Sequence, residues 1–201
     1  EIAVEDDGLL TRLLSKCCDA GRLVTVHAED RELVERKKAQ LKTGEKPTVE
    51  DFLKAHSKEA ELLAVRRMIG LATTTRACLH ICHLSAFKSL DSIEEAKRKG
   101  LRVTCETSPH YMFLNENYLR RLKGIALTVP PVRDSTNSRM LWNAFRDSRI
   151  DVIATDHAPH AEEEKTSDDV WDVSPGIPGL ETALPLLLTR VNKGQLPLIR
   201  L

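Results

Sequence analysis

Three residues of the types that bind metal ions each follow a short apolar run of the chain. They are His27, His83 and Asp156, which lie far apart in the sequence. Neutral imidazole and carboxylate groups are ligands of Zn²⁺, with bond lengths of about 2.0–2.2 Å. A single histidine at the end of a strand is more often a simple polar cap. Because all three residues follow apolar runs, we expect them to meet at one metal site.

Asp156 also has the chemistry of a proton carrier. It ends an apolar run and is followed by His157 and His160. A carboxylate beside a metal-bound water can accept the proton of that water and return it to a leaving nitrogen. The pattern therefore predicts metal-assisted hydrolysis with Asp156 as general acid and base. A serine hydrolase is not indicated, because the sequence contains no Gly-x-Ser-x-Gly turn.

Parallel strands are needed to bring these residues together. Four short runs rich in apolar and β-branched residues are predicted to be strands: Leu23–Val26, Ala77–Cys82, Leu101–Cys105 and Ile150–Thr155. Strands that alternate with helices form βα units on a parallel sheet. The carboxyl ends of such strands converge at the mouth of a barrel. We therefore expect the polar residue after each run, including Glu106 after the third, to lie at that mouth.

Helical patterns separate the predicted strands. Helices are predicted over Thr48 to about Gly70, Ser85–Lys99 and Ser135–Asp147. The first of these helices would place His56 on a solvated face. Ala161–Pro178 is acidic and then rich in Pro and Gly, which predicts a loop. His80 is predicted to be a hydrogen-bonded interior residue of its strand. His110 is predicted to have a packing role in a loop, and a place in the substrate pocket is the alternative.

A barrel explains these features better than an open nucleotide-binding sheet. Neither Gly-x-Gly-x-x-Gly nor a phosphate-binding Gly-x-x-x-x-Gly-Lys-Ser/Thr motif occurs in the sequence. A TIM-type barrel has eight strands and typically about 250 residues. The four predicted strands are half of that number. We therefore expect an α/β fold in which this chain supplies half of a barrel, with exposed sheet edges and an open apolar face.

The composition excludes several other classes of protein. The 201 residues carry no formal net charge, which argues against a polybasic nucleic-acid or membrane-surface binder. No apolar run approaches the roughly 20 residues of a membrane-spanning helix. The five cysteines include no Cys-x-x-Cys pair, and no second Cys/His pair at finger spacing accompanies Cys78–His83. Their odd number predicts a reducing compartment, the cytoplasm.

Several segments together resemble the dihydroorotases of the amidohydrolase superfamily. The segments similar to strands five to eight of that family are Val26–Asp30, His80–Ser85, Cys105–Tyr111 and Thr155–His160. Pro130–Arg133 is similar to the family's Asn-Pro-Pro-Leu-Arg, and Pro175–Pro185 resembles its late substrate loop. The resemblance covers nearly the whole chain and favours dihydroorotases over their relatives.

The resemblance implies a TIM-barrel-like (β/α)8 metal-dependent hydrolase in which this chain supplies about strands five to eight. Residues 1–201 would form the C-terminal part of one amidohydrolase barrel domain. It further implies two zinc ions, bridged by hydroxide and, in many members, by a carboxylated lysine. His27 and His83 would hold one ion, and Asp156 would bind the other while acting as general acid and base.

The resemblance also implies a substrate site and an activity. His160 would bind the substrate carboxylate, and the backbone of Pro175 and Gly176 would contact the substrate ring. The reaction would be the reversible conversion of N-carbamoyl-L-aspartate to dihydroorotate in pyrimidine biosynthesis. Two alternatives stay open: an amidohydrolase of allantoinase or hydantoinase type, and a non-catalytic scaffold for aspartate transcarbamoylase. The loop that begins at Pro175 favours the dihydroorotase.

The sequence departs from the family pattern in three respects. It contains no His-x-His of the first strand, and the family spacing puts the bridging lysine ahead of this chain. Asp7 is predicted to begin a helix rather than to replace that lysine. Val129 stands where many members have a substrate-binding asparagine. We therefore expect the chain to require a missing N-terminal half and to be inactive alone. The expected partners are that half, a small-molecule substrate, and a second copy or an aspartate transcarbamoylase, with neither nucleic acid nor membrane.

Overall fold

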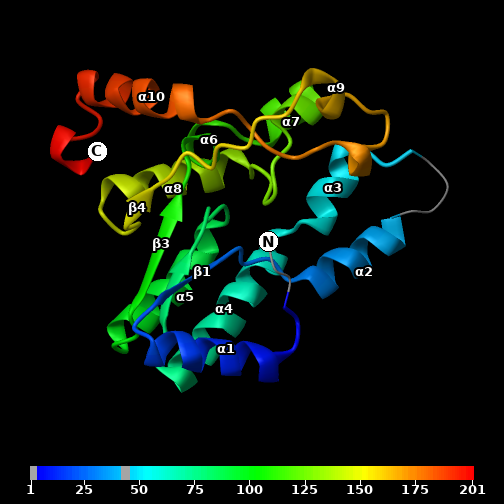
Figure 1. Cartoon of the computed structure of the whole chain (residues 1–201). Helices are drawn as coiled ribbons and strands as arrows, with labels where there is room; N and C mark the ends of the chain where they lie inside the picture. Colours follow the sequence, from blue (N-terminus) through cyan, green and yellow to red (C-terminus); the bar gives the residue numbers. More distant parts are fainter. Residues whose placement is uncertain (1–3, 42–45) are drawn as a thin grey trace.

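Four parallel strands form one sheet, in which each strand lies beside the next one along the chain (Figure 1). The structure is a computed structural model that describes residues 4–41 and 46–201. The strands are β1 (Leu23–Val26), β2 (Cys78–Ile81), β3 (Val103–Thr107) and β4 (Val152–Ile153). Doubly wound sheets reverse their strand order at a switch point, whereas barrels add strands in sequence. The order β1-β2-β3-β4 is therefore that of a barrel segment, and the predicted α/β fold is confirmed.

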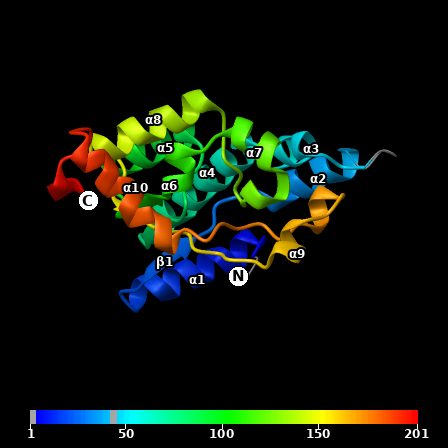
Figure 2. The same ribbon diagram turned by 90° about the horizontal axis from the view of Figure 1, so that it is seen from above.

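Helices and short 3₁₀ turns connect the strands. They are α1 (Asp7–Asp19), α2 (Arg31–Leu41), α3 (Val49–Ala55), α4 (Lys58–Thr75), α5 (Phe87–Arg98), α6 (Pro109–Phe113), α7 (Glu116–Leu122), η1 (Lys123–Ala126), α8 (Ser135–Arg146), α9 (Glu162–Lys165), η2 (Val170–Asp172), α10 (Leu180–Asn192) and η3 (Leu198–Arg200). Helices α1, α4, α5 and α8 form a row in which each packs against the next (Figure 2). Helices α1, α4 and α5 of this row also contact the sheet, as the outer layer of βα units does.

Helix α1 begins at the position where the sequence predicts a helix-start carboxylate. The side chain of Asp6 accepts a hydrogen bond from the backbone of Leu9 and caps the helix. Asp7 lies in the first turn, where a negative charge is favourable, and its carboxylate accepts a hydrogen bond of 2.7 Å from Arg67 Nε. Asp7 therefore starts α1 and ties it to α4.

The single helix predicted over Thr48 to about Gly70 is wrong, because two helices occupy this region. Helix α3 ends at Ala55, and the side chain of Ser57 caps α4 by accepting a hydrogen bond from the Ala60 amide. This second cap lets the chain change direction between the helices. The prediction that His56 is solvated is wrong for the same reason. Its side chain is only 13% exposed and lies at the break.

The third strand begins and ends two residues later than the sequence predicts. It runs over Val103–Thr107, so Glu106 lies inside the strand and does not follow its end. The Cys105 amide donates a hydrogen bond to Asp151 Oδ2, and the Ala154 amide donates to the Thr107 carbonyl. These contacts with the segment around β4 extend the paired region beyond Cys105.

Residues 161–178 are more ordered than the predicted loop. They contain the one-turn helix α9 and the 3₁₀ turn η2. The carboxylate of Glu164 accepts a hydrogen bond from the Ala161 amide at the start of α9. Asp169 accepts one from the Trp171 amide at the start of η2. Acidic residues that the sequence presents as a loop therefore act as local caps.

The two faces of the central strands differ in character. The side chains that pack into the helical layer belong to Leu79, Ile81, Val103 and Cys105, and all are buried in the main core. Because side chains alternate along a strand, His80 and Glu106 lie on the opposite face. The inner face of β2 and β3 is thus polar, and the expectation of an open apolar face is wrong there.

Exposed apolar side chains are instead found near the edges of the sheet. Leu23 on β1 is 55% exposed, and Val152 on β4 is 42% exposed. Helix α10, which follows β4, exposes a further series: Leu180, Leu184, Leu186 and Leu188. Among the described residues, no helix combines the length and the apolar character needed to cross a bilayer. In the same part of the chain, which includes all five cysteines, no disulfide is formed.

Candidate metal and substrate site

His27 and His83 meet at the carboxyl end of the first two strands. Val26 pairs with Ile81 in the register of β1 and β2, and the Cys82 amide extends this pairing by donating to the Val26 carbonyl. The residues that follow are therefore neighbours in space. His27 Nδ1 lies 3.1 Å from His83 Nε2. His83 reaches this position with a φ of 38°, in the left-handed region of the backbone.

The spacing of the two imidazoles fits a shared metal ion. Two nitrogens bound tetrahedrally to one zinc ion at 2.0–2.1 Å lie about 3.3 Å apart. The separation of 3.1 Å between His27 Nδ1 and His83 Nε2 is close to that value. Burial lowers the pKa of His83, the neighbouring His27 lowers it further, and the negative charge of Asp156 acts in the opposite direction. Neutral imidazole is the form that binds metals.

Asp156 lies at the same end of the sheet, beyond β4. Its φ of 48° turns the chain sharply after the strand. Its Oδ2 is 3.6 Å from His110 Nε2, and its charge acts on His83. Over the described ranges, however, His27, His83 and Asp156 are not a set whose ligand atoms all lie within 4.8 Å of one another. The two histidines form a compact pair, and the carboxylate lies beside that pair.

His110 enters this cluster, although the sequence favours a packing role for it over a place in the substrate pocket. Its side chain is buried, and its Nε2 has no hydrogen-bond partner. Burial, with a further contribution from His83, lowers the pKa of His110 to about 3. His110 is therefore a neutral imidazole whose unpaired nitrogen faces Asp156. Its place directly after Pro109, at a strand end, was the signal in the sequence.

Glu29 and His56 support His27 from its other side. His56 Nδ1 lies 2.8 Å from Glu29 Oε2, which in turn lies 3.9 Å from His27 Nε2. Burial alone would raise the pKa of Glu29, but its contacts with His27 and His56 lower that pKa to about 2. A carboxylate behind a metal-binding histidine fixes the orientation of its ring. The break between α3 and α4 supplies the His56 half of this support.

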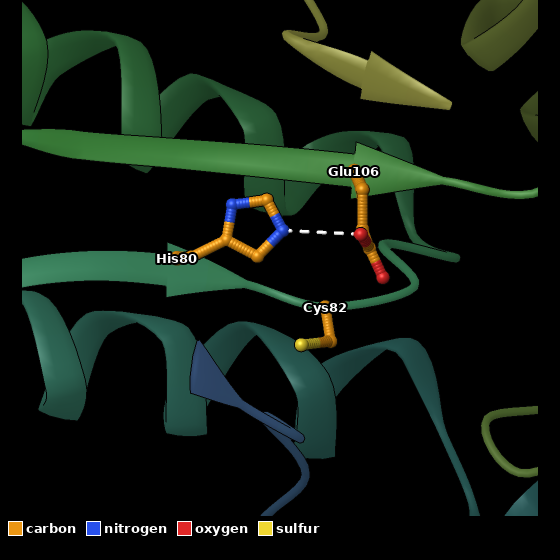
Figure 3. A group of neighbouring side chains, drawn as sticks. All are labelled: His80, Cys82 and Glu106. Carbon is orange, nitrogen blue, oxygen red and sulfur yellow. Dashed lines mark hydrogen bonds and ion pairs between the residues drawn. The ribbon is translucent and has the colours of Figure 1, made fainter. Parts of the chain in front are cut away.

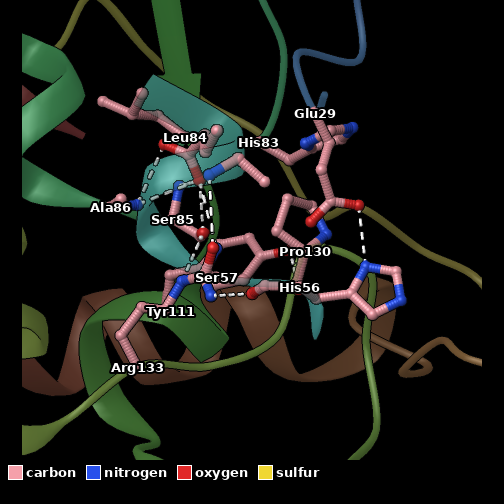
Figure 4. Close-up of polar contacts among 12 residues, drawn as sticks. Glu29, His56, Ser57, His83, Leu84, Ser85, Ala86, Tyr111, Pro130 and Arg133 are labelled. Carbon is pink, nitrogen blue, oxygen red and sulfur yellow. Dashed lines mark hydrogen bonds and ion pairs between the residues drawn. The ribbon is translucent and has the colours of Figure 1, made fainter. Parts of the chain in front are cut away.

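A buried polar network holds the loop that carries His83 (Figure 4). Glu61 of α4 is 2% exposed and accepts hydrogen bonds from the Ser85 amide, the Ser85 hydroxyl and the Ala86 amide. Arg133 Nε donates to the same hydroxyl at 3.0 Å, and another nitrogen of its guanidinium donates to the His56 carbonyl. Arg133 comes from the Pro-Pro-Val-Arg segment. The network therefore joins three loops around the candidate site.

The three residues predicted to bind substrate lie together. His160 Nε2 is 3.1 Å from the Pro175 carbonyl oxygen. Gly176 has a φ of 153°, and a Cβ at this position would lie 2.3 Å from the Ala158 carbonyl oxygen. The Ala158 amide also donates to the Ile177 carbonyl. The segment after Asp156 thus packs directly on the Pro-Gly loop, and only glycine fits at position 176.

Lys165 stabilises this loop through hydrogen bonds, and the sequence did not predict this role. Its side chain is buried, and its Nζ donates to the carbonyl oxygens of Leu127, Ser174 and Gly176 at 2.8–3.2 Å. Burial lowers its pKa. Lys165 ends an acidic run that is typical of a solvated loop. Its function depends on carbonyl groups from distant segments, which the local pattern does not contain.

A hollow of about 910 Å³ lies away from this site. It is lined by residues of α4 and α5 and by Arg76 and Arg102, which precede β2 and β3. It therefore opens at the amino end of the strands, opposite His27 and His83. Active sites of parallel barrels lie at the carboxyl end. The chemistry of the side chains, rather than the size of the hollow, locates the candidate site.

Comparison with known proteins found relatives over almost the whole chain. A dihydroorotase of Methanosphaera stadtmanae is 39% identical over 194 residues, covering 96% of this chain and 44% of the relative. A dihydroorotase of Geobacter sulfurreducens is 40% identical over 211 residues, covering 98% and 47%. No family model matches the chain. The chain spans about half the length of the curated relatives it matches.

Solved structures agree in fold. An L-hydantoinase (dihydropyrimidinase) from Arthrobacter aurescens matches with a TM-score of 0.94 and 29% identity, over 99% of this chain and 45% of that one. A D-hydantoinase (dihydropyrimidinase) from Thermus sp. matches with a TM-score of 0.92 and 29% identity, over 98% and 44%. The four-stranded sheet and its helices therefore correspond to under half of each of these larger chains.

Proposed function

We propose that this chain, a relative of the dihydroorotases, is the C-terminal part of a dihydroorotase barrel. In this proposal the complete protein interconverts N-carbamoyl-L-aspartate and dihydroorotate. The single observation that supports it most is the pair of imidazole nitrogens, His27 Nδ1 and His83 Nε2, held 3.1 Å apart at the carboxyl end of the sheet. The similarity to dihydroorotases over 96% of the chain gives this pair its chemical context.

Two zinc ions are the proposed cofactor. His27 and His83 would hold one ion, and Asp156 would be a ligand of the other, whose remaining ligands come from the other half of the barrel. When bound, zinc lowers the pKa of water to roughly 7 and polarises a carbonyl oxygen. Glu29 supports this assignment, because its carboxylate faces the nitrogen of His27 that is turned away from His83.

Asp156 is the proposed general acid and base. In the hydrolytic direction, water adds to a ring carbonyl of dihydroorotate, and the carboxylate of Asp156 accepts the proton that the water loses. The ring C–N bond then breaks, and Asp156 returns the proton to the leaving nitrogen. The neutral His110, with Nε2 at 3.6 Å from Asp156 Oδ2, adds no charge that would compete with this transfer.

The contacts between the two late segments support a substrate-binding role. His160 would bind the carboxylate of the substrate, and the backbone of Pro175 and Gly176 would lie against its ring. Lys165 would keep this backbone in place, since it donates to the carbonyl of Gly176 and to that of Ser174. The rigid loop would therefore orient the substrate at little cost in entropy.

The other half of the barrel is the proposed partner. The exposed Leu23 and Val152 lie on the two edge strands, and α10, which contacts α6, exposes Leu184. Exposed edges and apolar side chains of this kind favour association. The N-terminal half would cover them, whether it is part of the same polypeptide or a separate one. We propose the cytoplasm as its location, because an odd number of cysteines is typical of a reducing compartment.

A hydantoinase-type activity is the second candidate. The TM-score of 0.94 to an L-hydantoinase favours it, as does Val129, which packs against the core and offers no side-chain hydrogen bond to a substrate. The loop from Pro175 onward favours the dihydroorotase. Assays of the complete protein with dihydroorotate, allantoin and hydantoin, run side by side, separate these activities.

The expected result is turnover of dihydroorotate that exceeds turnover of both other substrates. Asp156→Ala should reduce this turnover by about 10²–10⁴-fold and leave the circular dichroism spectrum unchanged. A preference for hydantoin or allantoin would replace the proposal with the second candidate. The absence of turnover with all three substrates would instead favour a scaffold for aspartate transcarbamoylase.

A further inference from the structure

Three side chains on the inner face of the central strands form a compact group of metal-ligand types (Figure 3). They are His80 of β2, Cys82 directly after it, and Glu106 of β3. One ligand atom from each lies within 4.8 Å of the other two. His80 Nε2 and Glu106 Oε2 are 3.1 Å apart. The strand register pairs His80 with Thr104, which brings Glu106 beside Cys82 on the same face.

We propose that His80, Cys82 and Glu106 form a separate zinc-binding site within the barrel. Imidazole, thiolate and carboxylate are the three donor types that zinc takes from proteins, and a thiolate selects zinc over magnesium or calcium. Three protein ligands leave a fourth position for water or for a ligand from the other half of the barrel. This inference goes beyond the proposed activity and does not depend on it.

The hydrogen bonding of His80 prepares it to bind a metal. Its Nε2 lies 3.1 Å from Glu106 Oε2, and because a carboxylate only accepts, Nε2–H donates this hydrogen bond in the metal-free protein. Its Nδ1 is 2.7 Å from the hydroxyl oxygen of Thr104, which accepts a proton on Nδ1 once a metal ion replaces the proton on Nε2. A hydrogen bond from the second ring nitrogen fixes the tautomer and the ring orientation in metal sites. Thr104 therefore supports His80 as Glu29 supports His27.

An ion pair between His80 and Glu106 explains less of the arrangement. Such a pair needs only two residues, whereas the sulfur of Cys82 completes a set of three ligand atoms that all lie within 4.8 Å of one another. The side chains of His80 and Glu106 are 10% and 19% exposed, so an ion could enter from the inner face. Binding would release the thiol proton of Cys82, and the divalent charge would balance the thiolate and the carboxylate.

The site is distinct from the pair formed by His27 and His83. His80 and Glu106 lie within β2 and β3, Cys82 lies between β2 and His83, and neither His27 nor His83 belongs to the set of three ligand atoms. The proposed site also contains the thiol of Cys82, so metal binding to it can be followed by absorption spectroscopy. Cobalt(II) bound by a thiolate gives an intense sulfur-to-metal charge-transfer band in the near ultraviolet, and cobalt bound only by imidazole and carboxylate gives none.

The test is a titration of the metal-free complete protein with cobalt(II) chloride. We expect the thiolate band to appear and Cys82→Ser to abolish it, with one cobalt ion fewer bound per protein. Glu106→Gln, which keeps the thiol, should weaken the cobalt affinity measured from the same band by at least about tenfold. Cys78→Ser, at the start of β2, is the matched control and should leave the band unchanged.

Two outcomes of the cobalt titration would contradict the proposed site. A wild-type protein that binds cobalt without a thiolate band, or a band that survives in Cys82→Ser, would overturn the proposed site. Because the band does not depend on turnover, its loss in Cys82→Ser and the failure of dihydroorotate turnover are separate outcomes. A Cys82→Ser protein with wild-type circular dichroism shows that loss of the band does not result from misfolding.

Discussion

The side chains around the centre of the sheet are more completely buried than those near its edges. Around β2 and β3, even charged groups are buried and hydrogen-bonded, as Glu61 and Arg133 are with Ser85. On β1 and on α10, which follows β4 in the chain, large apolar side chains such as Leu23 and Leu184 remain exposed. The chain thus contains the contacts that shape the His83 loop, whereas its edges present surface suited to association. Substitutions at the centre should therefore change the geometry of the site, whereas substitutions of exposed apolar residues should change the assembly of the barrel.

The largest effect is expected at the centre, from Glu61→Ala. This change removes the acceptor of three hydrogen bonds and leaves the buried guanidinium of Arg133 without its neighbouring carboxylate at 3.7 Å. Breaking a buried charge pair costs about 3–5 kcal/mol. Denaturant unfolding of the protein measures this loss.

Glu59→Ala on the same helix is the matched control. Glu59 is 66% exposed and pairs with Lys37 at 3.5 Å, so its loss should cost at most about 1 kcal/mol. Equal effects of the two substitutions would contradict the difference drawn between buried and exposed contacts of α4.

A smaller effect is expected at the substrate loop, from Gly176→Ala. An alanine Cβ would lie 2.3 Å from the Ala158 carbonyl, in a backbone conformation that residues other than glycine rarely adopt. Strain of this kind costs about 1–3 kcal/mol, and dihydroorotate turnover should fall with it because the loop must move. Gly194→Ala is the comparison, since it also has a positive φ but meets no atom within 4 Å. Thermal unfolding should rank Gly176→Ala as the more harmful, and the reverse order would contradict the packing of the loop.

The edges are tested by Leu184→Gln in the complete protein. Leu184 is 55% exposed in this chain and is proposed to be covered by the other half of the barrel. Because burying a leucine contributes about 1.5–3 kcal/mol, the substitution should destabilise the complete protein by about 1–2 kcal/mol. Leu63→Gln is the control on α4, within the row of helices, and should change stability by no more than about 0.5 kcal/mol. Indistinguishable unfolding curves for the two variants would argue that α10 stays exposed.

The smallest effect is expected from alkylation of the cysteines at pH 8. Burial, helped by the charge of Asp151, raises the pKa of the Cys105 thiol to about 12. A raised pKa keeps the thiol protonated and unreactive until the pH approaches that value. Iodoacetamide should therefore label the partly exposed Cys17 and spare Cys105. Peptide mapping by mass spectrometry gives the ratio of labelled Cys17 to labelled Cys105. Rapid labelling of Cys105 in the folded protein would contradict its burial.

Local patterns in the sequence predicted the four strands, with the third displaced by two residues, and the polar residues that follow three of them. Apolar runs followed by His27, His83 and Asp156 are signals contained in a few neighbouring residues. The resemblance to dihydroorotases then placed the two late segments in one site, and the structure brings His160 and Pro175 into contact.

The supporting residues could not be predicted in this way. Glu61 is one of many charged residues in a helix, and its burial depends on Ser85 and Arg133, which lie far along the chain. The burial of Lys165 depends in the same way on distant carbonyl groups. The break at His56 did leave a local trace in Ser57, a residue type that favours the first position of a helix.

The zinc dependence of dihydroorotate turnover tests the central claim most directly. The complete protein would be stripped of metal with a chelator, and turnover would be measured as Zn²⁺ is returned. We predict that activity disappears on chelation and returns with zinc in the wild-type protein, but not in Asp156→Ala. Turnover that survives both chelation and the Asp156→Ala substitution would contradict the account.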